Sequence, residues 1–306
     1  MNRKLLMSLL IIFVLAGALP CFAQSLKASS PAASQKTPLL HRQYLEGQKL
    51  AYHMKGANED WRYEIQADAS VKKDSAGLFV EEFTWSNLRS NRPGETLSPA
   101  VAAFRETLSL DPNYRLTVPD LSQVIQIVGP ITDLLTFYPD WQLAAGQANL
   151  HNSGDHFYFK HGTPHSWADG SFVILGQDSI DFDIQLKSID PSNQKATLVV
   201  LHVIPEHPQV QFPAEWMRAA VSDTPNNWVN VVKLGDTGYL AEGGKETFDV
   251  EMIVRLSDGR ILSGTLDNTV ISSRRQCSDA ALTRCGDPSP HSIHRFIEIS
   301  SLGAGH

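Results

Sequence analysis

The stretch TLVVLHVI, from Thr197 to Ile204, is apolar on both faces of the strand that it predicts. Successive side chains of a strand point to opposite faces, so Leu198, Val200 and His202 share one face, and the residues between them form a second apolar face. A strand of this kind has to be covered on both sides. We therefore expect helices against one face and a closed or curled sheet on the other.

Alternating apolar and polar residues fill most of the chain around this strand. In the runs Ile180–Leu186 and Phe248–Leu256 every second residue is apolar, which predicts strands with one face on a core and the other in water. Asp258-Gly259 predicts a hairpin turn between two such strands. The sequence thus predicts a mainly β fold, an antiparallel barrel or half-barrel of about ten strands, as a single domain over residues 46–302.

A helical insertion is expected at about residues 120–145. Leu121, Val124 and Val128 recur at helical spacing, and the Gly129-Pro130 pair that follows them is a typical helix stop. The same spacing resumes after this pair and continues to a second proline. We therefore predict two short amphipathic helices with their apolar faces against the sheet.

The N-terminus is typical of an export signal. A short basic start precedes an apolar run from Leu5 to Leu19, and Ala23 is a small residue at a suitable cleavage position. We predict a signal peptide over residues 1–23, export to the periplasm or the extracellular space, and a flexible Ser/Ala-rich leader over residues 24–45. No other stretch is long and apolar enough to cross a bilayer, so the mature chain is expected to have no transmembrane segment.

The cysteines agree with export. Cleavage near Ala23 removes Cys21 and leaves Cys277 and Cys285 as the only two thiols. Two cysteines that lie close together in the sequence of an exported chain predict a disulfide that closes a short loop.

The charge of the chain argues against nucleic acid as a partner. The net charge is −7, and removal of Arg3 and Lys4 with the signal peptide gives −7 − 2 = −9. Nucleic-acid binding requires clustered basic residues on a positively charged surface. We therefore expect no nucleic-acid partner.

The stretch GDHFYFKHGTPHSWADG, residues 154–170, carries the densest group of polar side chains. His161 and His165 flank a Gly-Thr-Pro turn, and Asp155 or Asp169 could complete a zinc site. Polar residues also gather at turns for purely structural reasons. We expect a structural turn without a tightly held ion.

Motifs for nucleophilic, phosphate-binding or zinc-protease chemistry do not occur in the sequence, so we assign no catalytic residue and no cofactor. The sequence leaves open whether the protein is an enzyme and favours a non-catalytic role. We expect an exported binder of an apolar small molecule or lipid, or a structural component of the envelope. The alternative is a metal-dependent hydrolase that uses residues 155–169. The residues expected to line an apolar ligand cavity are Leu121, Val124, Val128, Leu198, Val200 and His202.

Two resemblances accompany these patterns. The strand-rich architecture with one helical insertion resembles the outer-membrane lipoprotein carriers and related exported β-barrels, a resemblance of pattern that assigns no individual residue a role. The segments SWADG (166–170), NNWV (226–229) and GKETFDV (244–250) resemble elements of a family of secreted bacterial proteins. This second resemblance implies a family without implying an activity.

Overall fold

The computed structural model describes residues 38–92, 95–117, 119–147, 149–161, 165–167, 173–235 and 238–303, with the backbone alone for 165–167 and 173–178. All of these residues belong to one compact unit. The predicted signal peptide, the predicted leader up to residue 37, and Asp169 lie outside these ranges.

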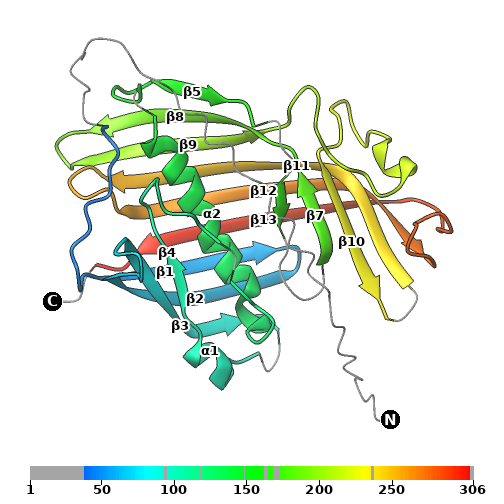
Figure 1. Cartoon of the computed structure of the whole chain (residues 1–306), viewed down its shortest axis with the longest axis horizontal. Coiled ribbons are helices and arrows are strands. Elements are labelled where there is room, and N and C mark those ends of the chain that lie inside the picture. Colours follow the sequence, from blue (N-terminus) through cyan, green and yellow to red (C-terminus); the bar gives the residue numbers. More distant parts are fainter. Residues whose placement is uncertain are drawn as a thin grey trace. The chain divides into compact units, whose positions relative to one another are not determined.

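Strands dominate the described residues, and two α-helices and two short 3-10 helices accompany them (Figure 1). The strands are β1 (Lys49–Asn58), β2 (Trp61–Lys73), β3 (Phe79–Ser90), β4 (Glu106–Leu108), β5 (His156–Phe159), β6 (His165–Trp167), β7 (Val173–Asp178), β8 (Asp181–Asp190), β9 (Lys195–Val203), β10 (Trp228–Leu234), β11 (Gly238–Arg255), β12 (Ile261–Cys277) and β13 (Ser289–Ser301). The helices are α1 (Pro99–Ala103), η1 (Ile125–Ile127), α2 (Val128–Ala145) and η2 (Glu215–Arg218).

The thirteen strands form one antiparallel sheet that divides at β11. From one edge the order is β4-β3-β2-β1-β13-β12-β11. The first half of β11 then pairs with β10, which leads to β7 and β6, whereas its second half pairs with β9, which leads to β8 and β5. The described strands do not close on themselves, so the predicted mainly β, antiparallel fold is confirmed in its half-barrel form.

Asn227 holds the sheet together where the two branches separate. Its side-chain nitrogen donates to the carbonyls of Ser179 and Glu246, at 3.1 Å each, and its side-chain oxygen accepts from the amide of Glu246 at 2.7 Å. Its backbone bonds Gly244 and Ser179 as well. This fully buried amide therefore replaces the ladder hydrogen bonds that the division of the sheet interrupts.

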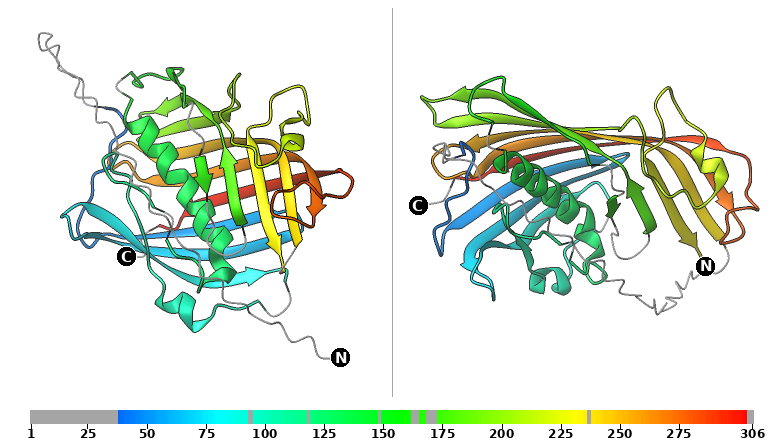
Figure 2. Two further views of the ribbon diagram at one scale, coloured as in Figure 1. Left: turned by 45° about the vertical axis from the view of Figure 1, so that its right-hand side comes forward. Right: turned by 45° about the horizontal axis from the view of Figure 1, so that its top comes forward.

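One helix, α2, packs against the concave face of the curved sheet (Figure 2). The predicted break at Gly129-Pro130 is wrong, because α2 runs through Pro130 and Pro139 over 18 residues. Pro130 is the third residue of the helix. A backbone N–H at this position has no acceptor within the helix, so a proline, which lacks the N–H, costs little stability there. Eleven residues of α2 are buried, so the helix fills the concave side of the half-barrel instead of covering an opening.

The strand β9 is covered on one face only, which corrects the expectation of two covered faces. Leu198 and Val200 are completely buried on the side of α2. The opposite apolar face is half-buried. There Val199 lies between Gln185 on β8 and Glu251 on β11, whose long side chains can shield it through their methylene groups.

Residues 38–48, the N-terminal segment, are packed against the sheet, in contrast to the flexible leader predicted up to residue 45. Leu40 belongs to the main core. The ring of Tyr44 stacks on Phe79 with centroids 5.7 Å apart. The amide of Gln43 donates to the carbonyl of Asp258 in the β11–β12 hairpin at 2.9 Å.

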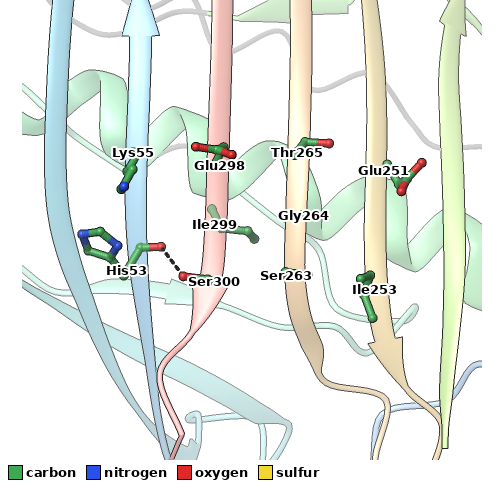
Figure 3. A pocket seen from close by; sticks show the side chains of 10 residues that line it. All are labelled: His53, Lys55, Glu251, Ile253, Ser263, Gly264, Thr265, Glu298, Ile299 and Ser300. Carbon is green, nitrogen blue, oxygen red and sulfur yellow. Dashed lines mark hydrogen bonds between the residues drawn. The ribbon is translucent and has the colours of Figure 1, made fainter. Parts of the chain in front are cut away.

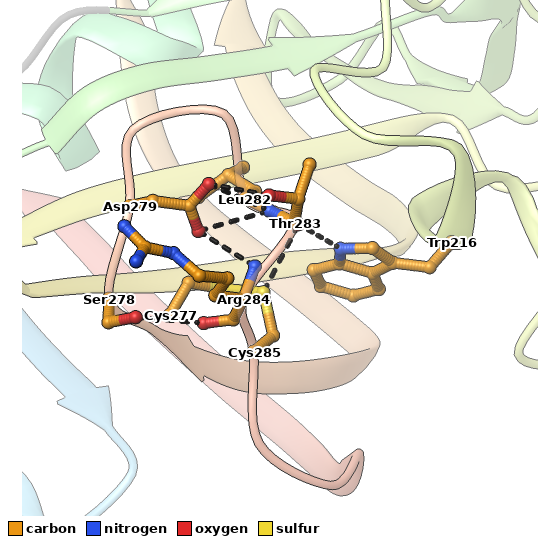
Figure 4. Close-up of a disulfide and its surroundings, with 8 residues drawn as sticks. All are labelled: Trp216, Cys277, Ser278, Asp279, Leu282, Thr283, Arg284 and Cys285. Carbon is orange, nitrogen blue, oxygen red and sulfur yellow. Dashed lines mark hydrogen bonds between the residues drawn. A yellow bond between two sulfur atoms is a disulfide. The ribbon is translucent and has the colours of Figure 1, made fainter.

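The predicted disulfide between Cys277 and Cys285 is confirmed (Figure 4). The loop that it closes is further ordered by Asp279, whose carboxylate accepts from the amide of Arg284 at 2.8 Å. The indole of Trp216 donates to the carbonyl of Leu282 at 3.2 Å and joins the loop to a second, smaller core.

Candidate functional site

Polar side chains interrupt the apolar concave face along one row across the sheet. His202, Phe248, Asn268 and Arg295 lie directly opposite one another on β9, β11, β12 and β13. Residues that are paired in this way point to the same face. This row therefore faces α2 and brings an imidazole, an amide and a guanidinium to the helix.

Asp140 of α2 and His202 of β9 form a buried pair. The Nε2 atom of His202 lies 2.9 and 3.0 Å from the two carboxyl oxygens of Asp140, and the side chains are 8% and 2% exposed. The imidazole packs between the rings of Phe182 and Phe248, with centroids 4.8 and 4.9 Å away. Its Nδ1 atom has no hydrogen-bond partner among the described residues. The pair thus binds the C-terminal half of α2 to β9.

Asp133, two turns earlier on α2, makes the second polar contact with the sheet. Its carboxyl accepts from the hydroxyl of Tyr63 at 2.7 Å and lies 3.2 Å from the guanidinium of Arg295. Burial raises the pKa of Asp133 above its ordinary value, although Arg295 opposes this shift. Burial, and then the charge of Asp133, also raise the pKa of Tyr63.

Glu246 on β11 lies close enough to both pairs to affect their electrostatics. Asn268 donates to its carboxyl at 3.0 Å. Burial raises the pKa of Glu246, while the charges of Arg295 and His202 lower it. We call the whole set the concave polar cluster; its members are Tyr63, Asp133, Asp140, His202, Glu246, Asn268 and Arg295.

The concave polar cluster is arranged to hold α2 in place. It contains three carboxyl groups against one guanidinium and one imidazole, and Asp133 and Asp140 are almost completely buried. Asp140 bonds His202, Asp133 lies against Arg295, and Glu246 accepts from Asn268, so each carboxyl of the cluster has a partner on the sheet. Its chemistry is therefore that of a polar contact between a helix and a sheet.

Glu106 on the edge strand β4 is a different kind of buried acid. It is 1% exposed, and neither carboxyl oxygen has a hydrogen-bond partner among the described residues. Burial raises the pKa of Glu106 well above its ordinary value. The protonated form is therefore favoured in the folded chain relative to the unfolded chain.

Glu106→Gln is expected to make the protein more stable at pH 7.5 and to change its stability little at pH 4.5. The folded state of the natural chain binds the Glu106 proton more tightly than the unfolded state, so its stability falls as pH rises from the ordinary glutamate range through the raised pKa. One proton contributes a slope of at most about 1.4 kcal/mol per pH unit. Urea unfolding at several pH values measures this slope, and an identical slope in both proteins would refute the assignment.

A polar hollow of about 440 Å³ lies on the convex face of the sheet, opposite α2 (Figure 3). Across the strands, Lys55 lies opposite Glu298, and Thr265 lies between Glu298 and Glu251. Apart from Ile253, Gly264 and Ile299, the lining consists of polar side chains of a solvated sheet face. The hollow therefore lacks the features of a small-molecule pocket.

The residues predicted to line a ligand cavity lie in the main core. Leu121, Leu198 and Val200 are 0% exposed, so no space large enough for water adjoins them. Val124 is also buried, and Val128 is half-buried against the same core. In this structure the site of the predicted cavity is occupied by side chains, many of them from α2.

The residues considered as metal ligands are not brought together where the structure describes them. Asp155 accepts from the amides of His151 and Asn152 at 2.9 and 2.7 Å, which lowers its pKa and fixes a local turn. The ring of His161 stacks on Phe159, with centroids 5.9 Å apart. Among the described residues no group of three or more His, Cys, Asp or Glu side chains is placed to hold a metal ion.

For the other two residues considered as metal ligands, the structure describes no side chain. His165 begins β6, of which only the backbone is described, and Asp169 lies outside the described residues.

None of the helices in the described ranges is long and apolar enough to cross a membrane.

The described residues define an open antiparallel half-barrel with a helix bound to its concave face by buried polar contacts. No family model, curated protein or solved structure matches the chain.

Proposed function

We propose that the protein is an exported, non-catalytic binding protein that takes an apolar ligand, such as a lipid, on the concave face in place of α2. The observation that carries this proposal is that a broad apolar face is covered by one helix with few stabilising features of its own. α2 has no side-chain hydrogen bond at its N-cap, no acidic residue in its first turn and no basic residue in its last turn, and Pro139 lies within it. Such a helix depends on tertiary contacts, and an apolar ligand can substitute for them.

Two further features support the proposal. The disulfide between Cys277 and Cys285 is of a kind that persists in oxidising compartments outside the cytosol. The carboxyl groups Asp133 and Asp140 are satisfied by the sheet while α2 is bound and would be hydrated once α2 is displaced. Displacement of α2 therefore uncovers the concave face, which is apolar except for the sheet's own members of the concave polar cluster, and returns these carboxyls to water.

A fluorescent fatty-acid probe is expected to bind the delipidated chain saturably, and Phe137→Leu is expected to bind it more tightly. Phe137 of α2 lies directly over Gly264, where a Cβ atom would be 2.7 Å from the ring. The smaller side chain buries about one methylene less against the sheet, so displacement of α2 costs about 0.8 kcal/mol less, which corresponds to about a fourfold gain in affinity. Fluorescence titration of both chains measures the effect.

The matched control is Phe296→Leu, which makes the same change on a residue of β13 whose neighbours Arg295 and Ile297 face α2. Its affinity for the probe should equal that of the natural chain. Native mass spectrometry of the protein from its own host should also show a retained apolar molecule. Absence of saturable binding together with absence of a retained molecule would refute the proposed function.

A further inference from the structure

The N-terminal segment reaches the core through one buried ion pair. The Nε and Nη2 atoms of Arg42 lie 3.1 and 2.9 Å from Oε1 of Glu81 on β3, and the two side chains are 1% and 0% exposed. Arg42 also donates to the carbonyl of Asp258 and lies over the ring of Tyr44, 4.2 Å from its centroid. The segment is thus joined to the sheet by a fully desolvated charge pair.

The second oxygen of the same carboxylate belongs to α2. The hydroxyl of Tyr138 donates to Oε2 of Glu81 at 2.5 Å, and the ring of Tyr138 packs edge-on against Phe83. Glu81 therefore bonds the N-terminal segment with one oxygen and the concave helix with the other. No other charged side chain contacts Glu81 among the bonds of the described residues.

We infer that the N-terminal segment regulates the release of α2, with Glu81 as the link between them. Removal of one partner from a buried ion pair leaves an uncompensated charge, which is strongly destabilising. When Arg42 is withdrawn, that charge lies against Tyr138, and the least costly response is for α2 to move away and admit water. This inference rests on the proposed function, because release of α2 is the step that exposes the concave face to a ligand.

Amide hydrogen exchange of the full chain, without ligand, tests the link. In Arg42→Met the amides of α2 are expected to exchange at least ten times faster than in the natural chain, while the amides of β12 keep their rates. Arg105→Met is the matched control, since Arg105 is an exposed arginine whose hydrogen bonds within the described part of the chain go to the nearby carbonyls of Ala102 and Phe104. Its α2 rates should not change.

A second variant separates the link from general destabilisation. Arg42→Met combined with Glu81→Gln leaves no buried charge, and the amide oxygen can still accept from Tyr138, so the protection of α2 should return. Unchanged α2 rates in Arg42→Met, an equal acceleration of α2 and β12, or no recovery in the double variant would each overturn the inference. Because the probe ligand is absent from these measurements, the link can hold even if the fatty-acid titration fails, and the two proposals can fail separately.

Discussion

Asp140→Ala is expected to lower the free energy of unfolding by about 2–3 kcal/mol, the usual cost of losing a buried hydrogen bond to a charged group and leaving its partner unsatisfied. The variant leaves Nε2 of His202 without its acceptor, in a pocket formed by Phe182 and Phe248 where the imidazole is 8% exposed. It also removes one of the polar contacts that bind α2 to the sheet, beside those of Asp133 and Tyr138. Urea denaturation at pH 7 measures the loss.

A double-mutant cycle with His202→Phe distinguishes this explanation from a simple loss of packing. A phenylalanine at position 202 can pack between the two neighbouring rings, and it needs no hydrogen bond. Replacement of both partners by apolar groups is often nearly neutral, so Asp140→Ala/His202→Phe should recover most of the stability. If the loss of unfolding free energy in the double variant equals the sum of the two single losses, Asp140 and His202 are not coupled.

The mainly β architecture could be predicted from the sequence because it depends on the alternation of apolar and polar residues within each strand. All but the first residue of the run Ile180–Leu186 lies in β8, and all but the last residue of the run Phe248–Leu256 lies in β11. Asp258-Gly259 is the turn between β11 and β12, with a positive φ of 72° at Gly259. These features follow from the two-residue period of a strand and the backbone freedom of glycine. The division of the sheet at Asn227 could not be predicted, because it depends on which distant strands pair with each half of β11.

The concave polar cluster could not be predicted, because the sequence pattern of α2 places its carboxylates on a solvated face. Asp133 and Asp140 alternate with apolar residues in a way that suggests an amphipathic helix, yet the sheet curves around α2 and buries both of them. Their partners Arg295, Tyr63 and His202 lie on strands that are distant in the sequence. The only local signal was His202, a polar residue in the otherwise apolar run 197–204.

A second missed signal is a glycine within a strand, which marks a close approach by another group. Gly56 on β1 lies opposite Tyr63 on β2, and a Cβ atom at Gly56 would lie 1.9 Å from the ring of Tyr63. The ring cannot easily move aside, because its hydroxyl is bonded to Asp133 and its face lies against Trp61, with centroids 4.9 Å apart. Gly56 therefore creates the space that lets Tyr63 reach α2.

Gly56→Ala should for this reason destabilise the protein by about 3–5 kcal/mol, as the sum of overpacking and the loss of a hydrogen bond to a charged group. Gly286→Ala is the control, since a Cβ atom there meets only an ordinary contact at 3.8 Å, and it should be almost neutral. In Gly56→Ala/Tyr63→Leu the clash is gone, so the double variant should cost clearly less than the sum of the single changes. Chemical denaturation of the natural chain and of these variants, with Tyr63→Leu alone as the second single change, measures these costs. Additive costs would mean that Gly56 does not act through Tyr63 and its bond to Asp133 on α2.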